Sequence, residues 1–265
     1  MVVGGGYIGL ESAAVLRKLG MAVTLLETMP RLLQRVTTAE VAEFYRRVHM
    51  EEGVDIRCQQ AVSRIAGEHF VSAVHCLGGD VLPAELVIVG IGVVPHTELA
   101  ASAGLSTQQG ILVDEFARTS DPHIVAAGDC TKFPSALYGR TIRLESVPHA
   151  VGQATAAAAT LVGRPAAYRA LPWFWSDQYD LKLQMAGLSQ GHEQVVVRGS
   201  LASGRSACVF YLRGGRLLAM DCINRPREFL QGKKLIEAQQ VLDPRQLVDP
   251  SCDLVSLLEP TATSS

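Results

Sequence analysis

The chain has 265 residues, of which 48% are hydrophobic and 19% charged, and its formal net charge is −2. This composition excludes a disordered chain and is typical of a globular protein long enough for two or three packed units. The near-neutral charge argues against binding to nucleic acid or to a membrane surface. No apolar run reaches membrane-spanning length and no signal sequence follows Met1, so we expect a cytoplasmic protein.

The first predicted element is a strand–turn–helix–strand unit at the start of the chain. Val2 and Val3 end a short strand, and the next six residues, GGGYIG, have the spacing G-x-G-x-x-G. Gly4 permits the tight turn, Gly6 lets the backbone approach a diphosphate, and Gly9 lets the following helix (8–19) pack close to the strand. The diphosphate then lies on the free N–H groups at the helix N-terminus. The alternative is a tight strand–helix turn without a ligand.

An acidic residue ends the second strand (21–27) of this unit. Glu27 follows the glycine turn at the distance where a carboxylate binds the ribose hydroxyls of an adenosine. A carboxylate there repels a 2′-phosphate, so NADH is favoured over NADPH. Arg31 and Arg35 lie close enough to keep NADPH open as an alternative.

A second glycine turn follows a predicted buried strand at residues 86–89. Gly90, Gly92 and Pro95 have the spacing G-x-G-x-x-P. Because the proline disfavours an immediate helix, we expect this turn to border a cofactor rather than to bind its diphosphate. An ordinary loop is the alternative.

The segment TSDPHIVAAGDC (119–130) predicts another site. Its short apolar strand (124–127) places Gly128 and Asp129 at a carboxyl end, where α/β folds bind ligands. An alanine-rich helix (149–161) follows, and its start near Pro148 directs N–H groups toward an anion or an electron-rich ring. The alternative for Asp129 is a helix-cap or turn aspartate.

From about Pro172 the pattern changes to strands joined by tight glycine turns, with a late helix over 226–240, which predicts a separate α+β unit. The tail after Pro260 is polar, and we expect it to be frayed. The six cysteines form no C-x-x-C pair, so we expect reduced and mostly buried thiols rather than a zinc site or a redox disulfide.

Together the motifs resemble the FAD-dependent ferredoxin reductases of the pyridine nucleotide-disulfide oxidoreductase superfamily. The resemblance rests on the two glycine turns and on TSDPHIVAAGDC, RLESVPHAVGQA and PWFWSDQY, in that order. It implies an α/β fold with a Rossmann-like NAD-binding domain (1–97), the C-terminal part of an FAD-binding domain (98–167), a small α+β reductase domain (168–258) and a tail (259–265).

The resemblance also implies roles for single residues. Asp129 bonds the ribitol chain of FAD, Val147 touches its ring, Trp175 lies by the flavin near the docking site, and Glu11 lies beside the nicotinamide. For Trp173, core packing is the preferred interpretation. The candidate cofactor-binding residues for NAD and FAD are Gly4, Gly5, Gly6, Tyr7, Ile8, Gly9, Glu11, Glu27, Arg35, Gly90, Ile91, Gly92, Gly128, Asp129, Val147, Pro148 and Trp175.

The activity implied by the resemblance is hydride transfer from NADH to FAD, followed by single-electron transfer to a putidaredoxin-like [2Fe–2S] ferredoxin that serves a cytochrome P450 or a Rieske-type oxygenase. The cofactors carry this chemistry, and no Ser–His–Asp or metal-binding constellation is needed. His149 is the one tempting general base, but a capping or contact role is the preferred interpretation.

The expected docking region for the ferredoxin includes Trp175, Lys182 and a basic stretch. That stretch has eight cationic residues and two acidic ones, so 8 − 2 gives +6; the alternative is an ordinary solvated face. The cationic residues are Arg198, Arg205, Arg213, Arg216, Arg225, Arg227, Lys233 and Lys234.

Reductases of this kind carry an earlier Rossmann half whose own glycine turn binds the ADP part of FAD. This chain has no second such turn, so we expect it to be the C-terminal part of a longer enzyme. Two alternatives stay open: an NAD-binding fragment without catalysis, and a related flavin reductase acting on rubredoxin or another acceptor.

Overall fold

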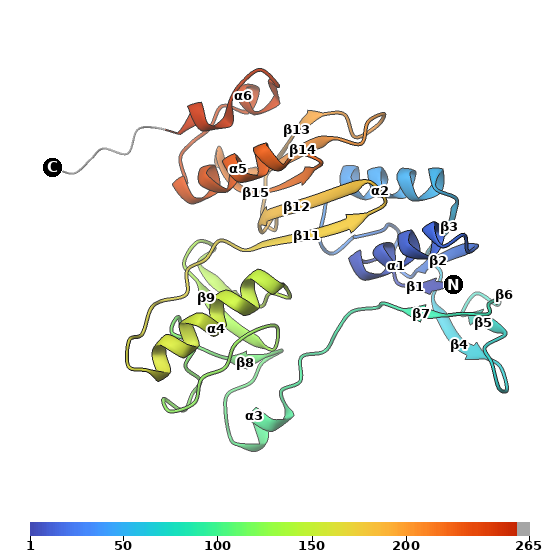
Figure 1. Cartoon of the computed structure of the whole chain (residues 1–265), viewed down its shortest axis with the longest axis horizontal. Helices are drawn as coiled ribbons and strands as arrows, with labels where there is room; N and C mark the ends of the chain where they lie inside the picture. The colour runs from blue at the N-terminus through green and yellow to red at the C-terminus, as the bar shows by residue number, and fades with distance from the viewer. Residues whose placement is uncertain (259–265) are drawn as a thin grey trace.

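Four β-sheets and the helices around them make up residues 1–258, the part of the chain that the computed structural model describes (Figure 1). The tail predicted after Pro260 lies outside these residues. No helix in the described part is both long enough and apolar enough to cross a membrane.

A parallel sheet with strand order β3-β2-β1-β7 carries the glycine turn and confirms the predicted strand–turn–helix–strand unit. An antiparallel sheet (β4-β5-β6) is inserted between β3 and β7. The elements are β1 (Val2–Val3), α1 (Tyr7–Lys18), β2 (Val23–Glu27), α2 (Ala39–Glu51), β3 (Val54–Cys58), β4 (Val62–Ala66), β5 (Ala73–Cys76), β6 (Val81–Pro83) and β7 (Ile88–Val89).

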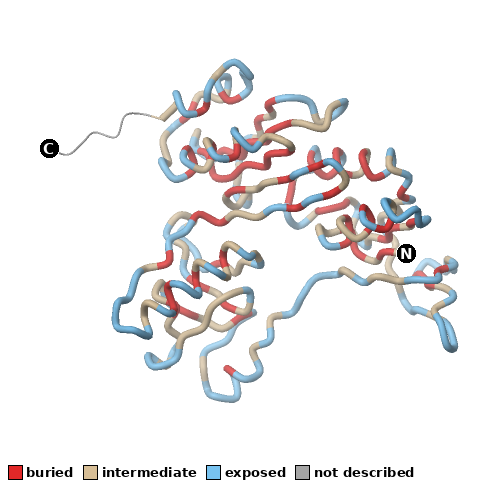
Figure 2. Tube along the Cα trace, in the orientation of Figure 1, coloured by how far each residue is buried: buried red, intermediate tan, exposed pale blue. Residues whose placement is uncertain are grey.

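The strand predicted at residues 86–89 is confirmed only over its second half, and its predicted burial is wrong. Only Ile88 and Val89 form a strand, and 42% of Leu86 and 54% of Val89 are exposed. The reason is position: β7 pairs with β1 on one side and is the outer strand of the described sheet. After β7 the chain continues as an extended, largely exposed segment to α3 (Glu98–Ser102) (Figures 1 and 2).

A second part of the chain surrounds the alanine-rich helix, which the structure confirms as α4. Ile142, Phe133 and Val113 form its small core with Ala156 and Tyr168. Its sheet has the order β10-β9-β8. The elements are β8 (Ile111–Leu112), β9 (Thr131–Ser135), β10 (Arg140–Ile142) and α4 (Val147–Leu161).

The strand predicted at residues 124–127 is also wrong. Val125 makes only an isolated bridge to Arg118. Ala117 (φ 63°) and Gly128 (φ 91°) have left-handed backbone conformations that interrupt a regular ladder on either side. Gly128 and Asp129 therefore precede a strand, β9, instead of ending one.

The C-terminal part is a five-stranded antiparallel sheet with strand order β11-β12-β15-β14-β13. Every residue of β14 and β15 except the terminal arginines is buried, because both faces of the central strands are covered (Figure 2). The late helix predicted at 226–240 is confirmed as α5, which packs on one face. The elements are β11 (Trp173–Gln178), β12 (Leu181–Gly187), β13 (Gln194–Gly199), β14 (Ala207–Arg213), β15 (Arg216–Ile223), α5 (Pro226–Ala238), α6 (Pro244–Val248) and a 3₁₀ turn (Leu254–Leu257).

The other face of this sheet shares one hydrophobic core with the first unit, which consists of the parallel sheet β3-β2-β1-β7 and the helices α1 and α2. Leu25, Leu10 and Phe44 belong to the same cluster as Leu183 and Tyr211. In Figure 1, β11 and β12 accordingly lie beside α1 and α2. The α+β unit that the sequence separates is thus joined to the first unit by a continuous apolar interior.

Of the six cysteines, most of which were expected to be buried, only Cys76, Cys208 and Cys222 are buried. Cys208 and Cys222 also lie opposite each other on β14 and β15, with their Sγ atoms 3.3 Å apart. Two cysteines that are distant in sequence are therefore neighbours in the sheet.

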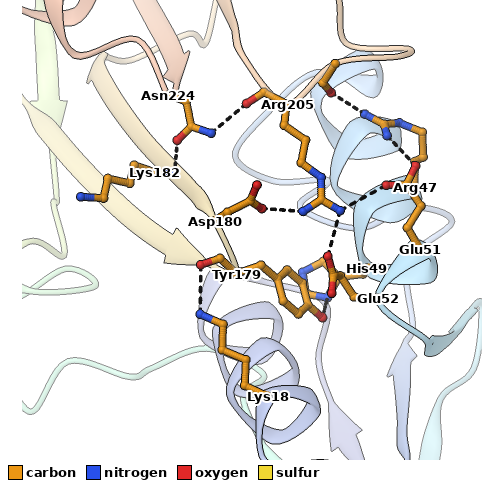
Figure 3. Close-up of polar contacts among 11 residues, drawn as sticks. Lys18, Arg47, His49, Glu51, Glu52, Tyr179, Asp180, Lys182, Arg205 and Asn224 are labelled. Carbon is orange, nitrogen blue, oxygen red and sulfur yellow. Dashed lines mark hydrogen bonds and ion pairs between the residues drawn. The ribbon is translucent and has the colours of Figure 1, made fainter.

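An arginine clamp links the same two units at the surface (Figure 3). Arg205, from the β13–β14 loop, contacts Asp180 at 2.5 Å, Glu52 at 2.8 Å and Glu51 at 3.3 Å. These hydrogen-bonded carboxylates raise the pKa of the guanidinium further above its already high value. Because Arg205 faces three acids at once, its removal leaves like charges close together.

A buried acid links the two units in the interior. The Asp221 carboxylate on β15 accepts hydrogen bonds at Oδ2 from the Tyr211 hydroxyl (2.5 Å) and from the Thr37 hydroxyl (3.0 Å), which precedes α2. Burial raises the pKa of Asp221 to about 6, although the two hydrogen bonds favour the ionised form. The folded protein therefore holds a proton on Asp221 more tightly than the unfolded chain does.

Arg205→Ala should lower the free energy of unfolding by about 1–2 kcal/mol at low salt, since a network of charges contributes more than one exposed pair. The difference from the parent protein should shrink as salt screens the remaining carboxylates. Denaturant unfolding at two salt concentrations measures it. Arg213→Ala is the matched control, because Arg213 is exposed and has no ion pair among the described residues; equal losses for the two variants would show that the clamp adds nothing.

Asp221→Asn should change how stability depends on pH. A carboxyl group whose pKa is raised from 3.8 to about 6 by folding costs no stability below pH 3.8 and costs about 3 kcal/mol above pH 6. The variant should therefore gain stability relative to the parent as pH rises from 4 to 7, in unfolding curves measured at each pH. Parallel pH profiles for the two proteins would mean that Asp221 does not titrate in this range.

Candidate functional site

The glycine turn has the geometry that its sequence predicts. Gly4 has a φ of 109°, and a Cβ on Gly9 would lie 1.9 Å from the Gly4 carbonyl oxygen. Any side chain at position 9 would therefore force α1 away from the turn. No atom lies within 4 Å of where a Cβ on Gly6 would stand, so the backbone is open to an approaching ligand.

The N-terminus of α1 points its free N–H groups at this open space. Gly6 is the N-cap and supplies no side-chain cap, and the first turn contains no acidic residue. The first N–H groups of a helix have no partner within the helix, and they attract anions. The turn can therefore accept a diphosphate without displacing any group of the protein.

The Glu27 side chain lies beside the turn at the end of β2. Its Oε2 atom accepts the Gly5 N–H (2.6 Å), and its Oε1 atom accepts the Met29 N–H (2.7 Å) and the Thr28 hydroxyl (3.1 Å). A carboxylate has about four acceptor positions, and three are used here, so Glu27 can hold the turn and still accept a hydrogen bond from a ribose.

A cavity of about 960 Å³ opens from the turn. Its walls come from the two glycine turns, from the segment around β9 and β10, and from β11, β12 and β15 of the C-terminal sheet. The predicted residues that line it are Gly4, Gly5, Gly6, Tyr7, Ile8, Glu27, Arg35, Gly90, Ile91, Gly92 and Asp129.

The remaining predicted residues lie outside the cavity wall. Gly9 packs under the turn, and Gly128 has its N–H on Gln153. Val147 and Pro148 begin α4, where 62% of Val147 is exposed. Trp175 is 40% exposed on β11, and Glu11 lies one helical turn beyond Tyr7.

Asp129 lies on the cavity wall with its carboxylate exposed and free of hydrogen bonds to other described residues. It caps no described helix, but its backbone lies in the turn closed by the Thr131 N–H on the Gly128 carbonyl (2.9 Å), so the alternative of a turn aspartate holds for the backbone and not for the side chain. Gln153 on α4 holds the adjacent backbone instead, since its Oε1 atom accepts the Gly128 N–H (2.8 Å) and the Thr131 hydroxyl (2.7 Å). Asp129 thus projects from a loop that α4 fixes in place.

His149 is a contact residue, as preferred from the sequence. Its ring stacks on Phe133 with the centroids 4.9 Å apart, and its Nδ1 atom lies 3.1 Å from the Tyr168 hydroxyl. Burial lowers the pKa of His149, which favours the neutral ring. The side chain packs α4 onto β9 and does not line the cavity.

The two tryptophans differ in environment. Trp173 is half-buried against Phe229, and the Lys233 ammonium lies 5.3 Å from the centroid of its ring, which confirms core packing. Trp173 also lines the cavity. Trp175, two residues on, has its ring 5.5 Å from the Trp173 ring and is 40% exposed.

The basic surface predicted between residues 198 and 234 does not exist as such. Arg198 is 3% exposed and donates to the carbonyls of Leu247, Gln246 and Cys252. Arg205 and Arg227 pair with acids outside the stretch. Only Arg213 and Lys234 are exposed without a partner in the described chain, because carboxylates, backbone carbonyls or, for Lys233, aromatic rings contact the others.

Two functional candidates were missed from the sequence. Asp221 lines the cavity, and Ser176 donates a hydrogen bond to Glu11 at 2.5 Å. A single acid inside the apolar run LLAMDCI was the available signal for Asp221. No signal pointed to Ser176, because its partner is 165 residues away.

Comparison with known proteins agrees with this geometry. Residues 1–154 match the pyridine nucleotide-disulphide oxidoreductase family model, and residues 173–258 match the reductase C-terminal model. Putidaredoxin reductase from Pseudomonas putida is 49% identical over 261 residues, and rhodocoxin reductase from Rhodococcus erythropolis is 44% identical over 255. These alignments cover 97% and 96% of this chain but 62% and 60% of the relatives, so the chain spans about three-fifths of their length.

Solved structures show the same likeness. A covalent putidaredoxin reductase–putidaredoxin complex aligns with a TM-score of 0.93 at 49% identity, over 97% of this chain and 62% of the other. The ferredoxin reductase for the CYP199A2 system from Rhodopseudomonas palustris aligns with a TM-score of 0.91 at 42% identity, over 96% and 63%. With a family model matched over more than half its residues and these folds superimposed on its own, the chain belongs to the pyridine nucleotide-disulphide oxidoreductase family.

Proposed function

We propose that the chain is part of an NADH-dependent ferredoxin reductase. The enzyme transfers hydride from NADH to FAD and then single electrons to a [2Fe–2S] ferredoxin of a P450 or Rieske-type oxygenase system. The observation that carries the proposal is the shared cavity. In it the glycine turn faces Asp129 and the β9–β10 segment, with Trp173 and Phe174 beside them.

The residues present fit NADH. The open backbone at Gly6 and the uncapped start of α1 match a diphosphate, and Glu27 matches a ribose with two free hydroxyls. Arg35 is exposed on the cavity wall, where it can meet a phosphate oxygen.

The residues also fit one end of FAD. Asp129 offers a carboxylate without a partner on the cavity wall, and Lys132 lies on the same wall. Bound FAD would supply the step between a two-electron donor and a one-electron acceptor. The chain's own part is to hold the ribitol hydroxyls at Asp129 and to keep that loop fixed through Gln153.

The acceptor is proposed from the relatives, several of which are named as ferredoxin reductases, and from the complex with putidaredoxin. Trp175 on the edge strand β11 and Lys182 on the neighbouring strand β12 are both exposed. We place docking at these two residues. The proposal also places the protein in the cytoplasm, in keeping with six free thiols.

Glu27→Ala should weaken NADH binding and reduce the preference over NADPH, because a charge-assisted hydrogen bond to the ribose contributes about 1.5–3 kcal/mol. The two dissociation constants are measured by titrating the purified chain. The substitution also removes the hydrogen bond between the Glu27 carboxylate and the Gly5 N–H, which lowers the affinities for NADH and NADPH equally. The ratio of the two dissociation constants therefore reports the ribose contact alone. Glu40→Ala, an exposed acid on α2, is the control; equal affinity of the parent chain for both nucleotides contradicts the assignment.

Electron delivery is tested by joining the chain to the part of putidaredoxin reductase that it does not match. The joined protein should retain FAD and reduce putidaredoxin with NADH. Lys182→Glu should lower the ratio of the ferredoxin rate to the ferricyanide rate about tenfold at low salt and less at high salt, because opposite charges steer the encounter. Lys234→Glu is the matched control. A joined protein that oxidises NADH with ferricyanide but never reduces a ferredoxin would refute the proposed acceptor.

A further inference from the structure

A chain of hydrogen bonds, buried at its centre and partly buried at its ends, runs from Glu11 on α1 into the C-terminal sheet and on to α2. The Ser176 hydroxyl lies 2.5 Å from Glu11 Oε1, and Gln178 Nε2 lies 3.0 Å from the Ser176 Oγ. Gln178 Oε1 lies 2.8 Å from His49 Nε2, and His49 Nδ1 lies 3.1 Å from the Tyr179 hydroxyl. Figure 3 shows the last of these contacts, between His49 and Tyr179.

The direction of every bond in this chain is set from the Glu11 end. A carboxylate only accepts, so Ser176 donates to it, and the Ser176 oxygen then accepts from the Gln178 amide. The Gln178 carbonyl needs a donor, which makes His49 the Nε2–H tautomer, and its Nδ1 accepts from Tyr179. Burial lowers the pKa of His49, which favours this neutral form.

The chain is built into the interior and not added at the surface. Ser176 and Gln178 are each 1% exposed, and His49 is fully buried. Buried polar groups cost free energy unless they find partners, and here each polar side chain of the interior makes hydrogen bonds on both sides. Only Glu11, at the end nearest the cavity, keeps an oxygen (Oε2) without a partner in the described part of the chain.

Glu11 lies on the face of α1 that leads from the cavity, so its free oxygen is placed to meet a ligand. Tyr7, which lines the cavity, lies one helical turn before Glu11 on the same face of α1. On β11, Phe174 packs against Tyr7 with ring centroids 5.1 Å apart, and Ser176 meets Glu11 two residues later. The β11 side chains therefore track the helix face that leads from the cavity.

We propose that Ser176, Gln178 and His49 are positioning residues that hold one carboxylate oxygen of Glu11 so that the other accepts the carboxamide N–H of the NADH nicotinamide. The inference rests on the proposed function, because it needs the nicotinamide to lie beside Glu11. The C-terminal reductase domain then contributes to the recognition of the dinucleotide as well as to docking.

The test compares two ligands that differ only beyond the second ribose: NADH and ADP-ribose, which lacks the nicotinamide. Ser176→Ala should weaken NADH binding to the chain about tenfold, the equivalent of one charge-assisted contact, and leave ADP-ribose binding unchanged. Ser176→Thr keeps the hydroxyl and should restore most of the NADH affinity. Ser63→Ala, which removes an exposed serine hydroxyl on β4, is the matched control.

A double-mutant cycle separates positioning from folding. In a Glu11→Ala background, Ser176→Ala should have no further effect on the ratio of the two dissociation constants, since the group that it orients is gone. Equal weakening of NADH and ADP-ribose by Ser176→Ala, or an unchanged ratio, overturns the inference while the proposed function stands. If the parent chain binds NADH no more tightly than ADP-ribose, the nicotinamide site proposed at Glu11 fails, and the positioning role fails with it.

Discussion

The match between one face of α1 and one face of β11 is the constraint on which the rest of the structure depends. Residues four apart on a helix are separated by about 6 Å, and residues two apart on a strand by about 6.6 Å. Tyr7 and Glu11 can therefore meet Phe174 and Ser176 in step, with an aromatic contact followed by a hydrogen bond. This register brings the glycine turn and the C-terminal sheet to opposite sides of one cavity.

The same strand serves two purposes because its side chains alternate. Phe174, Ser176 and Gln178 face α1 and α2, where the last two are buried. Trp175 and Asp177 point the other way and are exposed. One face of β11 thus carries Trp175, the proposed docking residue, and the other face packs against α1, the helix that follows the glycine turn.

Local pattern was enough to predict the parts of the fold that local physics dictates. The tight turn at Gly4, the close packing at Gly9 and the alanine-rich α4 follow from residues within one short segment. The expected strand at 124–127 failed because Ala117 and Gly128 have left-handed conformations that no apolar count reveals. The expected buried strand at 86–89 failed because burial depends on which strand is outermost in the sheet.

The site could be predicted where a short motif or a fixed spacing, such as that between the glycine turn and Glu27, places its residues. Charge along the chain was a poor guide, since Arg198 is buried on three carbonyls and Arg205 is held by acids from α2 and the β11–β12 turn. The roles of Asp221 and His49 could not be predicted, because their hydrogen-bond partners, Thr37 and Gln178, are more than a hundred residues away in the sequence.

The polar groups at the junction explain why the two units meet in a single register. Apolar surfaces alone tolerate sliding, whereas buried polar groups are satisfied in one alignment only. A shift of β11 by one residue would present Asp177 to Glu11 in place of Ser176, and two carboxylates would then face each other without a cation between them. A shift by two would bring Gln178 to Glu11 and leave His49 without its acceptor. The hydrogen-bond chain therefore fixes the geometry of the cavity, and with it the distance between the glycine turn and the C-terminal sheet.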